Sequence, residues 1–405
     1  MITRELAKAV RAEADALLPE LIALRRRLHA TPEIGFHLPQ TQTAVLEALE
    51  PLGLEITTGT DLSSVTAVLH GSSAGPSVLL RADMDALSIT EATGLPYAST
   101  NGAMHACGHD MHTAGLIGAA RLLTARRAEI AGSVVFMFQP AEEAGGGAPL
   151  MIRDGVLHAA GVRVDAAYGM HVGPGVRGLF QTRPGPIMAG SNAVKVRIRG
   201  RGGHGARPHL SVDPVPAVAE LVLALQNWVT RRFDVFDPVV LTVTKLFAGE
   251  VLNVIPDEAG FAATLRTLST ASIETVRNEL PAFVERIAAA HGCTAEVEVI
   301  VGYPVTVNSH AETASAIGTL RGMFGDERVE ELASPFMASE DFSYVLNEVP
   351  GAFIFFRTTP ADLDPAEAEA NHSPRAVFDD GLLADQAAAM AALALSHVGR
   401  AAVPA

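Results

Sequence analysis

The 405-residue sequence is poor in cysteine and in basic charge. Its two cysteines, Cys107 and Cys293, cannot build a disulfide framework, so we predict a protein of the reducing cytoplasm. Lys and Arg number 30 against 45 Asp and Glu, and the net charge of 30 − 45 = −15 argues against nucleic acid or an anionic membrane surface as a partner. No apolar run approaches the ~18 uncharged residues of a membrane span, and the N-terminus shows no apolar signal-peptide core.

What the sequence does contain is 48% hydrophobic residues in a chain long enough for two domains or three. Apolar runs bounded by Gly and Pro alternate with helical patterns and predict a largely parallel sheet covered by helices on both faces. Helices are predicted at 3–28, with Pro19 as a kink or restart, and at 39–52, 112–126 and 149–154. Strands are predicted at 64–69, 77–82, 133–138 and 166–171.

The pattern changes after about residue 181 to strand, helix, two strands, helix and strand, which predicts a split βαβ unit of the α+β class. The predicted elements are 194–198, 214–231, 239–247, 260–268, 273–290 and 295–301. From about residue 303 the chain returns to α/β character, with a strand at 352–356. We therefore predict a discontinuous catalytic domain, residues 1–184 and 303–405, interrupted by an inserted domain, residues 185–302.

The densest polar cluster lies at residues 104–112, where three histidines and one cysteine fall close together. Cys107 and His109 are two residues apart, with Gly108 between them, so both side chains can converge from a turn. Thiolate and imidazole together suit zinc or a neighbouring transition metal. A loop with scattered core histidines and a buried thiol is the plainer interpretation. A cysteine nucleophile is a third, although the sequence context of papain-like proteases is absent.

Other polar residues follow the predicted strands. Glu142 and Glu143 come after the apolar run 133–138, where open α/β sheets place ligands. Adjacent carboxylates point in different directions, so one can bind a metal while the other faces the attacking water. Asp85 and His171 also fall at strand ends, and His372 lies in a polar turn before the last helix. Each signal alone also fits a solvated strand end or a structural histidine; the argument is their joint placement.

These motifs together resemble the two-metal aminoacylase, hippurate-hydrolase and auxin-conjugate-hydrolase group of metallopeptidases, nearly from end to end. The matching motifs are His29-x-x-Pro32-Glu33, Arg81-Ala82-Asp83-Met84-Asp85-Ala86-Leu87, His105-Ala106-Cys107-Gly108-His109-Asp110, Gln139-Pro140-Ala141-Glu142-Glu143, Gly169-Met170-His171, Gly202-Gly203-His204-Gly205-Ala206-x-Pro208, Asn253-Val254-Ile255-Pro256-Asp257, Ser339-Glu340-Asp341-Phe342 and His372-Ser373-Pro374. The resemblance implies that the inserted domain is a ferredoxin-like lid through which the chain forms a homodimer or a higher oligomer.

The resemblance also implies a site for two divalent ions, zinc or else manganese, cobalt or nickel. Its ligands would be Cys107, His109, Glu143, His171 and His372, with the thiolate of Cys107 bridging both ions. The expected split is Cys107, His109 and His171 on one ion, and Cys107, Glu143 and His372 on the other. Three protein ligands on each ion leave a position for a shared water or a substrate oxygen.

By the same resemblance, Glu142 is the general base that takes a proton from this bridging water, and Asp85 holds a ligand in place. In the lid, His204 would stabilise the tetrahedral oxyanion, in its own subunit or across a dimer, and Asn253 would bind substrate. An exposed His in a Gly-rich turn is the alternative for His204. Arg266 could bind the substrate carboxylate, or form an ordinary ion pair on a strand surface.

The leading hypothesis is hydrolysis of the amide bond of N-acyl amino acids, including hippurate-like and N-acetyl substrates. A dipeptidase, which differs in recognising a free amino terminus, is a close alternative, as is carboxypeptidase-type hydrolysis of peptides. A non-catalytic metal-binding module would be expected to carry a damaged base or ligand set, and the sequence shows none.

Overall fold

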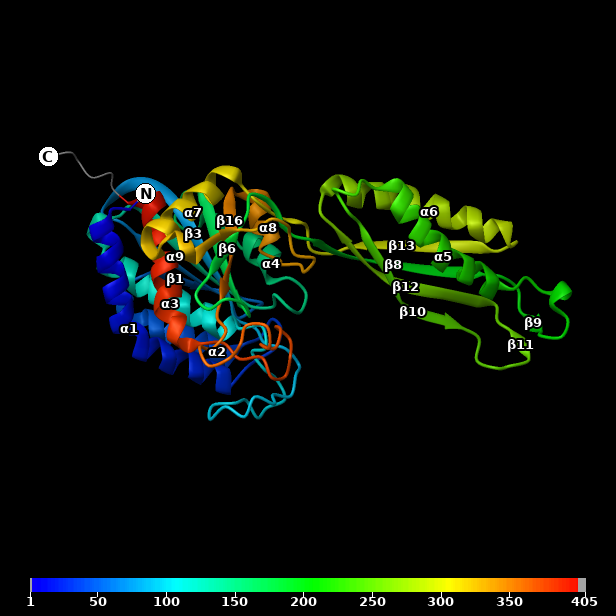
Figure 1. Cartoon of the computed structure of the whole chain (residues 1–405), viewed down its shortest axis with the longest axis horizontal. Coiled ribbons are helices and arrows are strands. Elements are labelled where there is room, and N and C mark those ends of the chain that lie inside the picture. Colours follow the sequence, from blue (N-terminus) through cyan, green and yellow to red (C-terminus); the bar gives the residue numbers. More distant parts are fainter. Residues whose placement is uncertain (1, 400–405) are drawn as a thin grey trace. The chain divides into compact units, whose positions relative to one another are not determined.

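The computed structural model describes residues 2–399 of the chain. Its contacts divide the protein into two units, which we call the sheet unit and the insert unit. The sheet unit contains the chain up to Ile187, Val307–Ser334 and the residues from Tyr344 on; the insert unit contains Met188–Thr306 and Pro335–Ser343. The insert unit is therefore drawn mainly in green and yellow in Figure 1, the colours of the middle of the sequence.

The sheet unit is built on eight strands in the order β1-β2-β4-β3-β5-β16-β6-β15. Their bounds are β1 Glu55–Thr58, β2 Val65–His70, β3 Ser73–Asp83, β4 Ala131–Gln139, β5 Ala166–Gly173, β6 Phe180–Thr182, β15 Val329–Glu331 and β16 Gly351–Arg357. The four central strands, β4, β3, β5 and β16, are mutually parallel. β2 joins them antiparallel on one side and β6 on the other. The predicted α/β class with a mostly parallel sheet is confirmed.

Helices pack on this sheet and on one another (Figure 1). Their bounds are α1 Arg4–Ala30, α2 Pro39–Leu49, α3 His109–Ala125, α4 Gly147–Arg153, α7 His310–Phe324, α8 Ser343–Glu348 and α9 Leu383–Val398. α1 continues through Pro19 instead of restarting there, and the Thr3 hydroxyl caps it by accepting the Leu6 N–H. An added Cβ at Gly118 of α3 would lie 2.6 Å from Ala387 of α9, so glycine lets the two helices approach closely.

One segment, Asp380–Val398, is long and apolar enough to cross a membrane by length and composition, with a mean hydropathy of 1.2. The segment contains Asp380 and Asp385, so it is not the run of ~18 uncharged residues that a membrane span was expected to need. In the structure 78% of its apolar window is buried inside the protein. A helix that is apolar all round and covered on all sides is a central core helix, and α9 packs against α1, α3 and α7.

The insert unit is a four-stranded antiparallel sheet in the order β10-β12-β8-β13 with two helices, which confirms the predicted βαββαβ pattern. Its main elements are β8 Gly190–Arg199, α5 Pro214–Arg232, β10 Val240–Ala248, β12 Glu258–Thr267, α6 Thr270–Ala290 and β13 Thr294–Val301. A two-stranded ribbon of β9 Gly203–His204 and β11 Val254–Ile255 extends it, and β7 Gly185–Met188 pairs with β14 Thr306–Asn308. Alternate residues of β8 are buried under the helices, and the outward ones, such as Lys195 and Arg199, pair with acidic side chains on neighbouring strands.

Candidate metal centre

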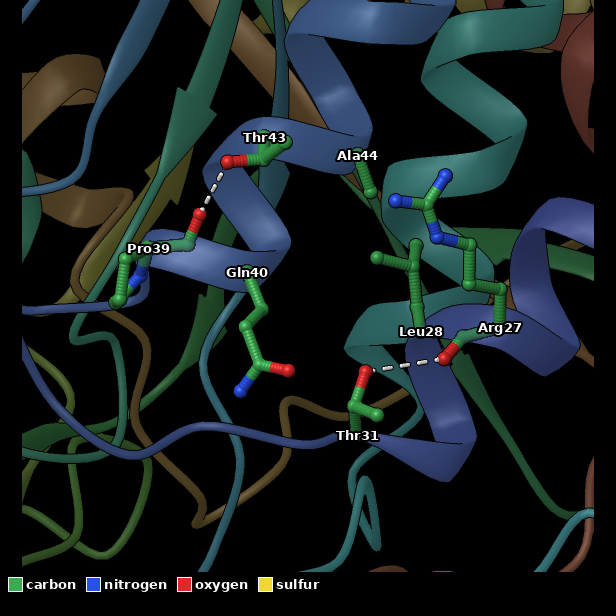
Figure 2. Close-up of a pocket in the computed structure, with 7 residues that line it drawn as sticks. All are labelled: Arg27, Leu28, Thr31, Pro39, Gln40, Thr43 and Ala44. Carbon is green, nitrogen blue, oxygen red and sulfur yellow. Dashed lines mark hydrogen bonds between the residues drawn. The ribbon is translucent and has the colours of Figure 1, made fainter.

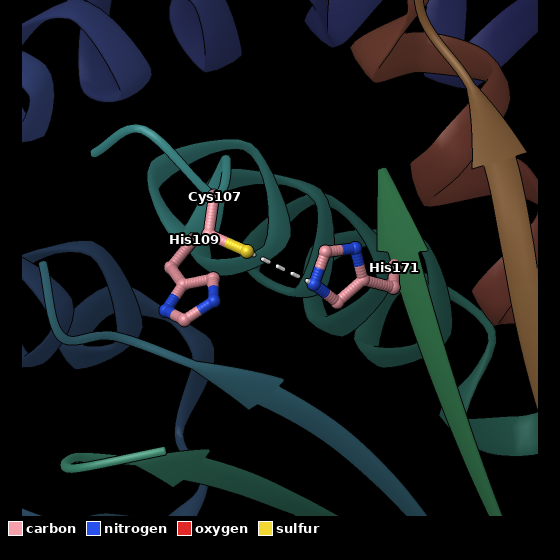
Figure 3. Close-up of side chains that lie close together, drawn as sticks. All are labelled: Cys107, His109 and His171. Atoms are coloured by element: carbon pink, nitrogen blue, oxygen red, sulfur yellow. Dashed lines mark hydrogen bonds between the residues drawn. The ribbon is translucent and has the colours of Figure 1, made fainter. Parts of the chain in front are cut away.

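The turn before α3 brings Cys107 and His109 together. Gly108 caps the helix with φ +83°, a left-handed conformation that favours glycine. A Cβ at this position would lie 2.3 Å from Cγ2 of Val172. The turn is thus packed directly against the end of β5. In Figure 3 the side chains of Cys107 and His109 both project from this turn, and the Cys107 thiol is directed at His171.

β5 supplies the third side chain of this group. Nε2 of His171 lies 3.4 Å from Sγ of Cys107 (Figure 3). Nδ1 of His171 donates to the carbonyl of Val172 at 2.7 Å, which leaves Nε2 as the nitrogen that faces the thiol. The strand was predicted to end at His171, but it continues to Gly173. His171 is therefore held within the strand itself and not at its end.

Glu142 and Glu143 follow β4 in a tight turn that begins at Ala141, which has φ +60°. Asp85 fixes this turn by accepting two backbone hydrogen bonds, from the N–H of Glu142 at 2.9 Å and from that of Glu143 at 3.0 Å. Because these two hydrogen bonds hold the backbone of Glu142 and Glu143, the carboxylates of both residues are confined to a small volume. The contacts agree with a supporting role for Asp85, which stays a proposal.

His372 comes from the loop before α9 and has φ +71°. Its backbone N–H donates to the carbonyl of Ala106 at 2.9 Å, and its Nε2 lies 2.9 Å from a carboxylate oxygen of Glu143. The neighbouring Asn371 donates from Nδ2 to the carbonyl oxygens of Cys107 and Val172, both at 3.2 Å. This loop therefore links the Cys107 turn to the end of β5.

The candidate ligand side chains form two overlapping groups. Within each group, the atoms that could bind a metal lie within 4.8 Å of one another. One group is Cys107, His109 and His171, and the other is Cys107, Glu143 and His372. Cys107 belongs to both, so the grouping is the one that the resemblance implies for two ions; the ligand assignment itself stays a prediction.

The charges and donor atoms of these groups fit divalent cations. Burial alone would raise the pKa of the Cys107 thiol, but the charge of His171 and contacts with His109 and His372 hold that pKa well below its usual range. Contacts with Cys107 and Glu143 raise the pKa of His372 to about 10, so anionic ligands here attract positive charge. Nε2 of His109 is buried without a hydrogen-bond partner among residues 2–399. An orphaned imidazole nitrogen beside a thiolate is suited to zinc or a neighbouring transition metal.

Glu142 stands beside both groups. One of its carboxylate oxygens, one of Glu143 and a ring nitrogen of His109 all lie within 4.8 Å of one another. Glu142 is buried, with 7% of its residue surface exposed, and the Glu143 side chain is 13% exposed. The adjacent acids thus reach the same small volume from slightly different directions, as a metal ligand and a neighbouring base require.

Three residues that shape this site were not assigned a role from the sequence, although the quoted motifs contain one of them, adjoin another and end two positions before the remaining one. They are Asp83, His112 and Asn371. Burial lowers the pKa of His112 to about 4 despite the adjacent carboxylate of Asp83. The signal that could have found them is the placement of Asp83 at the end of a strand and of His112 one helical turn after the Cys107 loop.

The predicted lid residues lie on the insert unit. His204 and Asn253 are brought together by the β9–β11 ribbon, where His204 pairs with Val254 and the N–H of Gly205 donates to the carbonyl of Asn253 at 2.8 Å. His204 is exposed, and its Nδ1 accepts the N–H of Ala206 at 3.1 Å. Arg266 lies apart from them on β12, half-buried, with a pKa lowered by burial.

A separate pocket of about 370 Å³ lies between the end of α1 and the start of α2 (Figure 2). The two threonine hydroxyls that line the pocket already donate hydrogen bonds to the backbone, from Thr43 to the carbonyl of Pro39 and from Thr31 to that of Arg27. None of its lining residues is among the predicted site residues. We therefore assign it no part in the chemistry.

Two candidate ligand groups that share a thiolate, with a second carboxylate beside them at the carboxyl ends of parallel strands, define a metal-dependent hydrolase. Residues 79–396 match the model of peptidase family M20/M25/M40, and the chain belongs to this family.

Individual relatives agree with the family. The chain is 39% identical to the N-acetyl-L-cysteine deacetylase of Bacillus subtilis over 347 residues, 85% of this chain and 82% of the relative. It is 36% identical to the IAA-amino acid hydrolase ILR1-like 4 of Arabidopsis thaliana over 384 residues, 93% of this chain and 86% of the relative. The crystal structure of the Bacillus subtilis YXEP protein, described as a dinuclear metal binding peptidase from the M20 family, matches with a TM-score of 0.82 and 33% identity over 94% of this chain and 98% of that one. The predicted resemblance is confirmed, and the chain is a hydrolase.

Proposed function

We propose that the protein hydrolyses the amide bond of N-acyl amino acids. The observation that carries this proposal is the buried carboxylate of Glu142 next to two ligand groups that share Cys107. The names of the two relatives support the substrate class, because one removes an acetyl group from an amino acid and the other acts on an auxin–amino acid conjugate. Both names describe an amide between an acyl group and an amino acid.

Cys107, His109 and His171 would hold one divalent ion, and Cys107, Glu143 and His372 the other. When bound, such ions polarise a carbonyl oxygen and make a water molecule more acidic. Glu142 takes a proton from the attacking water as the C–O bond forms, and delivers it to the amine nitrogen as the C–N bond breaks. The products are a carboxylate from the acyl group and a free amino acid. Zinc suits the thiolate and imidazole donors, and manganese, cobalt and nickel are the other candidates.

The insert unit would complete the site as a lid. In this proposal His204 donates a hydrogen bond to the carbonyl oxygen of the reacting amide, in its own subunit or from a neighbour, and Asn253 beside it binds substrate. Arg266 would bind the substrate carboxylate. This last role is supported by a half-buried guanidinium that forms no ion pair with a carboxylate in residues 2–399.

We further propose that the insert unit forms a homodimer through β10. β10 lies at the edge of its sheet and exposes Leu246 and Phe247, with 60% and 43% of their surface accessible, while Leu223 of α5 is 74% exposed. An unpaired apolar edge strand is a template for pairing with a second copy. Sedimentation equilibrium should give twice the monomer mass, and the charge substitution Leu246→Lys should shift it towards monomer. A wild-type monomer at micromolar concentration would contradict the proposal.

Cleavage of unmodified peptides is the second candidate, because the family is named for peptidases and the YXEP protein is described as one.

Both cysteines are free in the structure, which supports a reaction in the cytoplasm.

A substrate panel separates the candidates. Metal-reconstituted protein is assayed with N-acetyl-L-cysteine, N-acetyl-L-methionine and hippurate, and with glycyl-methionine as the matched free-amine substrate. We expect kcat/KM for N-acetyl-methionine to exceed that for glycyl-methionine by at least about tenfold, which corresponds to ~1.4 kcal/mol of discrimination. Faster cleavage of the dipeptide would favour the peptidase. Tightly bound metal without turnover of any compound would favour a non-catalytic module.

A further inference from the structure

The ligand His171 stands on a part of β5 that extends beyond one of its neighbours. The register of β3 against β5 ends where Arg81 lies opposite Gly169. On the other side, β16 continues to pair with β5 until Arg357 lies opposite Gly173. Beyond Gly169, therefore, β5 is held by a neighbouring strand on one side only. In a parallel sheet the backbone groups of such a segment face both sides, and buried N–H groups need a partner.

His112 takes the place of the missing strand. Its Nε2 accepts the backbone N–H of Val172 at 2.8 Å, directly after His171. Its ring also packs against both imidazoles of the same ligand group, with its centroid 5.3 Å from that of His109 and 4.7 Å from that of His171. One buried side chain of α3 thus contacts both histidines and the backbone that carries one of them.

The hydrogen bonds of His112 determine its tautomer. Since Nε2 accepts a hydrogen bond, the ring proton is on Nδ1, and this proton is donated to Oδ1 of Asp83. Nη1 of Arg81 holds the other carboxylate oxygen of Asp83 at 2.6 Å. Asp83 therefore keeps the Nε2 lone pair of His112 directed at Val172.

A metal ion is an alternative reason for this cluster, because Asp83, His109 and His112 come close enough to hold one. Both ring nitrogens of His112 are already used, however, one by Asp83 and the other by the Val172 N–H. A cation would have to displace a backbone hydrogen bond that no other strand can replace. Asp83 and His112 are therefore better suited to hold a metal ligand in position than to bind a metal ion themselves.

We propose that Asp83 and His112 are positioning residues that fix the metal ligand His171 through the backbone of Val172. The inference rests on the proposed function only in taking His171 to bind metal. In addition, the carbonyl of Val172 accepts hydrogen bonds from Nδ1 of His171 at 2.7 Å and from Asn371 at 3.2 Å. The Val172 backbone is thus held at both its N–H and its C=O, and His171 can present only Nε2 to the ion.

Two conservative substitutions of His112 test the proposal, because each can preserve one of its two hydrogen bonds. In His112→Gln the side-chain oxygen reaches the position of Nε2 and can still accept the Val172 N–H. In His112→Asn the side-chain amide stays near the position of Nδ1 and can still donate to Asp83, but nothing reaches Val172. Both variants are prepared as full-length apoprotein and titrated with cobalt(II), with the thiolate-to-cobalt absorption as the signal.

We expect His112→Asn to weaken cobalt binding by about 10–100-fold, and His112→Gln by much less, because only the glutamine keeps the Val172 contact. Amide hydrogen exchange at Val172 in the holoprotein should be faster in His112→Asn than in His112→Gln. If the asparagine variant binds cobalt as tightly as the glutamine variant or more tightly, the proposal is wrong and His112 serves only to donate a hydrogen bond to Asp83.

Asp83→Asn provides a second route if the His112 variants fold poorly. The carboxamide of this variant can donate a hydrogen bond to Nδ1 of His112, which would move the ring proton to Nε2. Nε2 could then no longer accept the hydrogen bond from the Val172 N–H. Cobalt affinity should fall about as far as in His112→Asn, and unchanged affinity would contradict the proposal. Cobalt affinity and hydrogen exchange do not depend on which substrate is cleaved. A failure of the proposed substrate class would leave these results unchanged, so the two failures are distinguishable.

Discussion

Replacing Gly108 by alanine should abolish metal binding and hydrolysis together. Two independent effects act at this position. The backbone has φ +83°, which costs an L-residue roughly 1–2 kcal/mol. The added Cβ would also lie 2.3 Å from Cγ2 of Val172 and 3.3 Å from the ring of Phe378, so the turn has to move. Cys107 and His109 flank this residue, and a displacement of about 1 Å is enough to reduce a rate by ~100-fold.

Gly102 offers a matched control in the same loop region. It has φ +85°, almost the same conformation, but an added Cβ would meet nothing within 4 Å. Gly102→Ala should therefore lose stability, about 1 kcal/mol from the backbone alone, and retain its metal. Metal content by mass spectrometry and the hydrolysis rate are measured on both purified variants. Full metal content and activity in Gly108→Ala would show that the turn tolerates the displacement and is not the basis of the site.

The carboxyl-end location of the site could be predicted because its main signals are local. Apolar runs followed by acidic residues identify strands and their ends, and Glu142 and Glu143 directly follow β4 in the structure. The turn at Cys107 could be predicted from Gly108 in the same way. The inserted unit could be predicted because its strands alternate buried and exposed residues, which is a strong signal for a sheet with one covered face.

Contacts between distant segments could not be predicted in this way. Asn371 reaches the carbonyl of Cys107 across 264 positions of the sequence, and His112 reaches the N–H of Val172 across 60. A single sequence gives the residue types but not these pairings. The short edge strands were missed for a different reason: β1, Glu55–Thr58, is mostly exposed and polar, so it carries little of the apolar pattern by which strands are recognised.

Backbone strain at the site was also invisible to local reasoning. Among residues 2–399, Ala141 and His372 are the non-glycine residues with positive φ, at +60° and +71°. Alanine disfavours this region, and histidine adopts it more often but still rarely. Surrounding contacts therefore hold both residues: the Asp85 hydrogen bonds after Ala141 and the Ala106 carbonyl at His372. That both lie at the candidate metal centre is a finding of the structure, and it indicates that tertiary contacts override local preference where ligands are positioned.

The substitution Glu142→Gln should separate chemistry from metal binding. The amide keeps the size of the side chain and the backbone hydrogen bond to Asp85, but it cannot take a proton from water. We expect a full metal content and a fall in kcat of about 10²–10⁴-fold, the range for loss of a general base. The rate is measured at saturating metal and saturating N-acyl amino acid, so that weak binding cannot account for the loss.

Glu143→Gln is the matched control, because the two carboxylates are adjacent in sequence and are clamped by the same aspartate. Glu143 contacts His372 and belongs to the ligand group with Cys107, so its amide variant should lose metal affinity, and excess metal should restore part of the activity. Excess metal should not restore Glu142→Gln. If the two variants behave alike in both tests, the carboxylates share one function and Glu142 is not a distinct base. If Glu142→Gln keeps its full rate with every active substrate, the proton is carried by another group and the proposed mechanism fails.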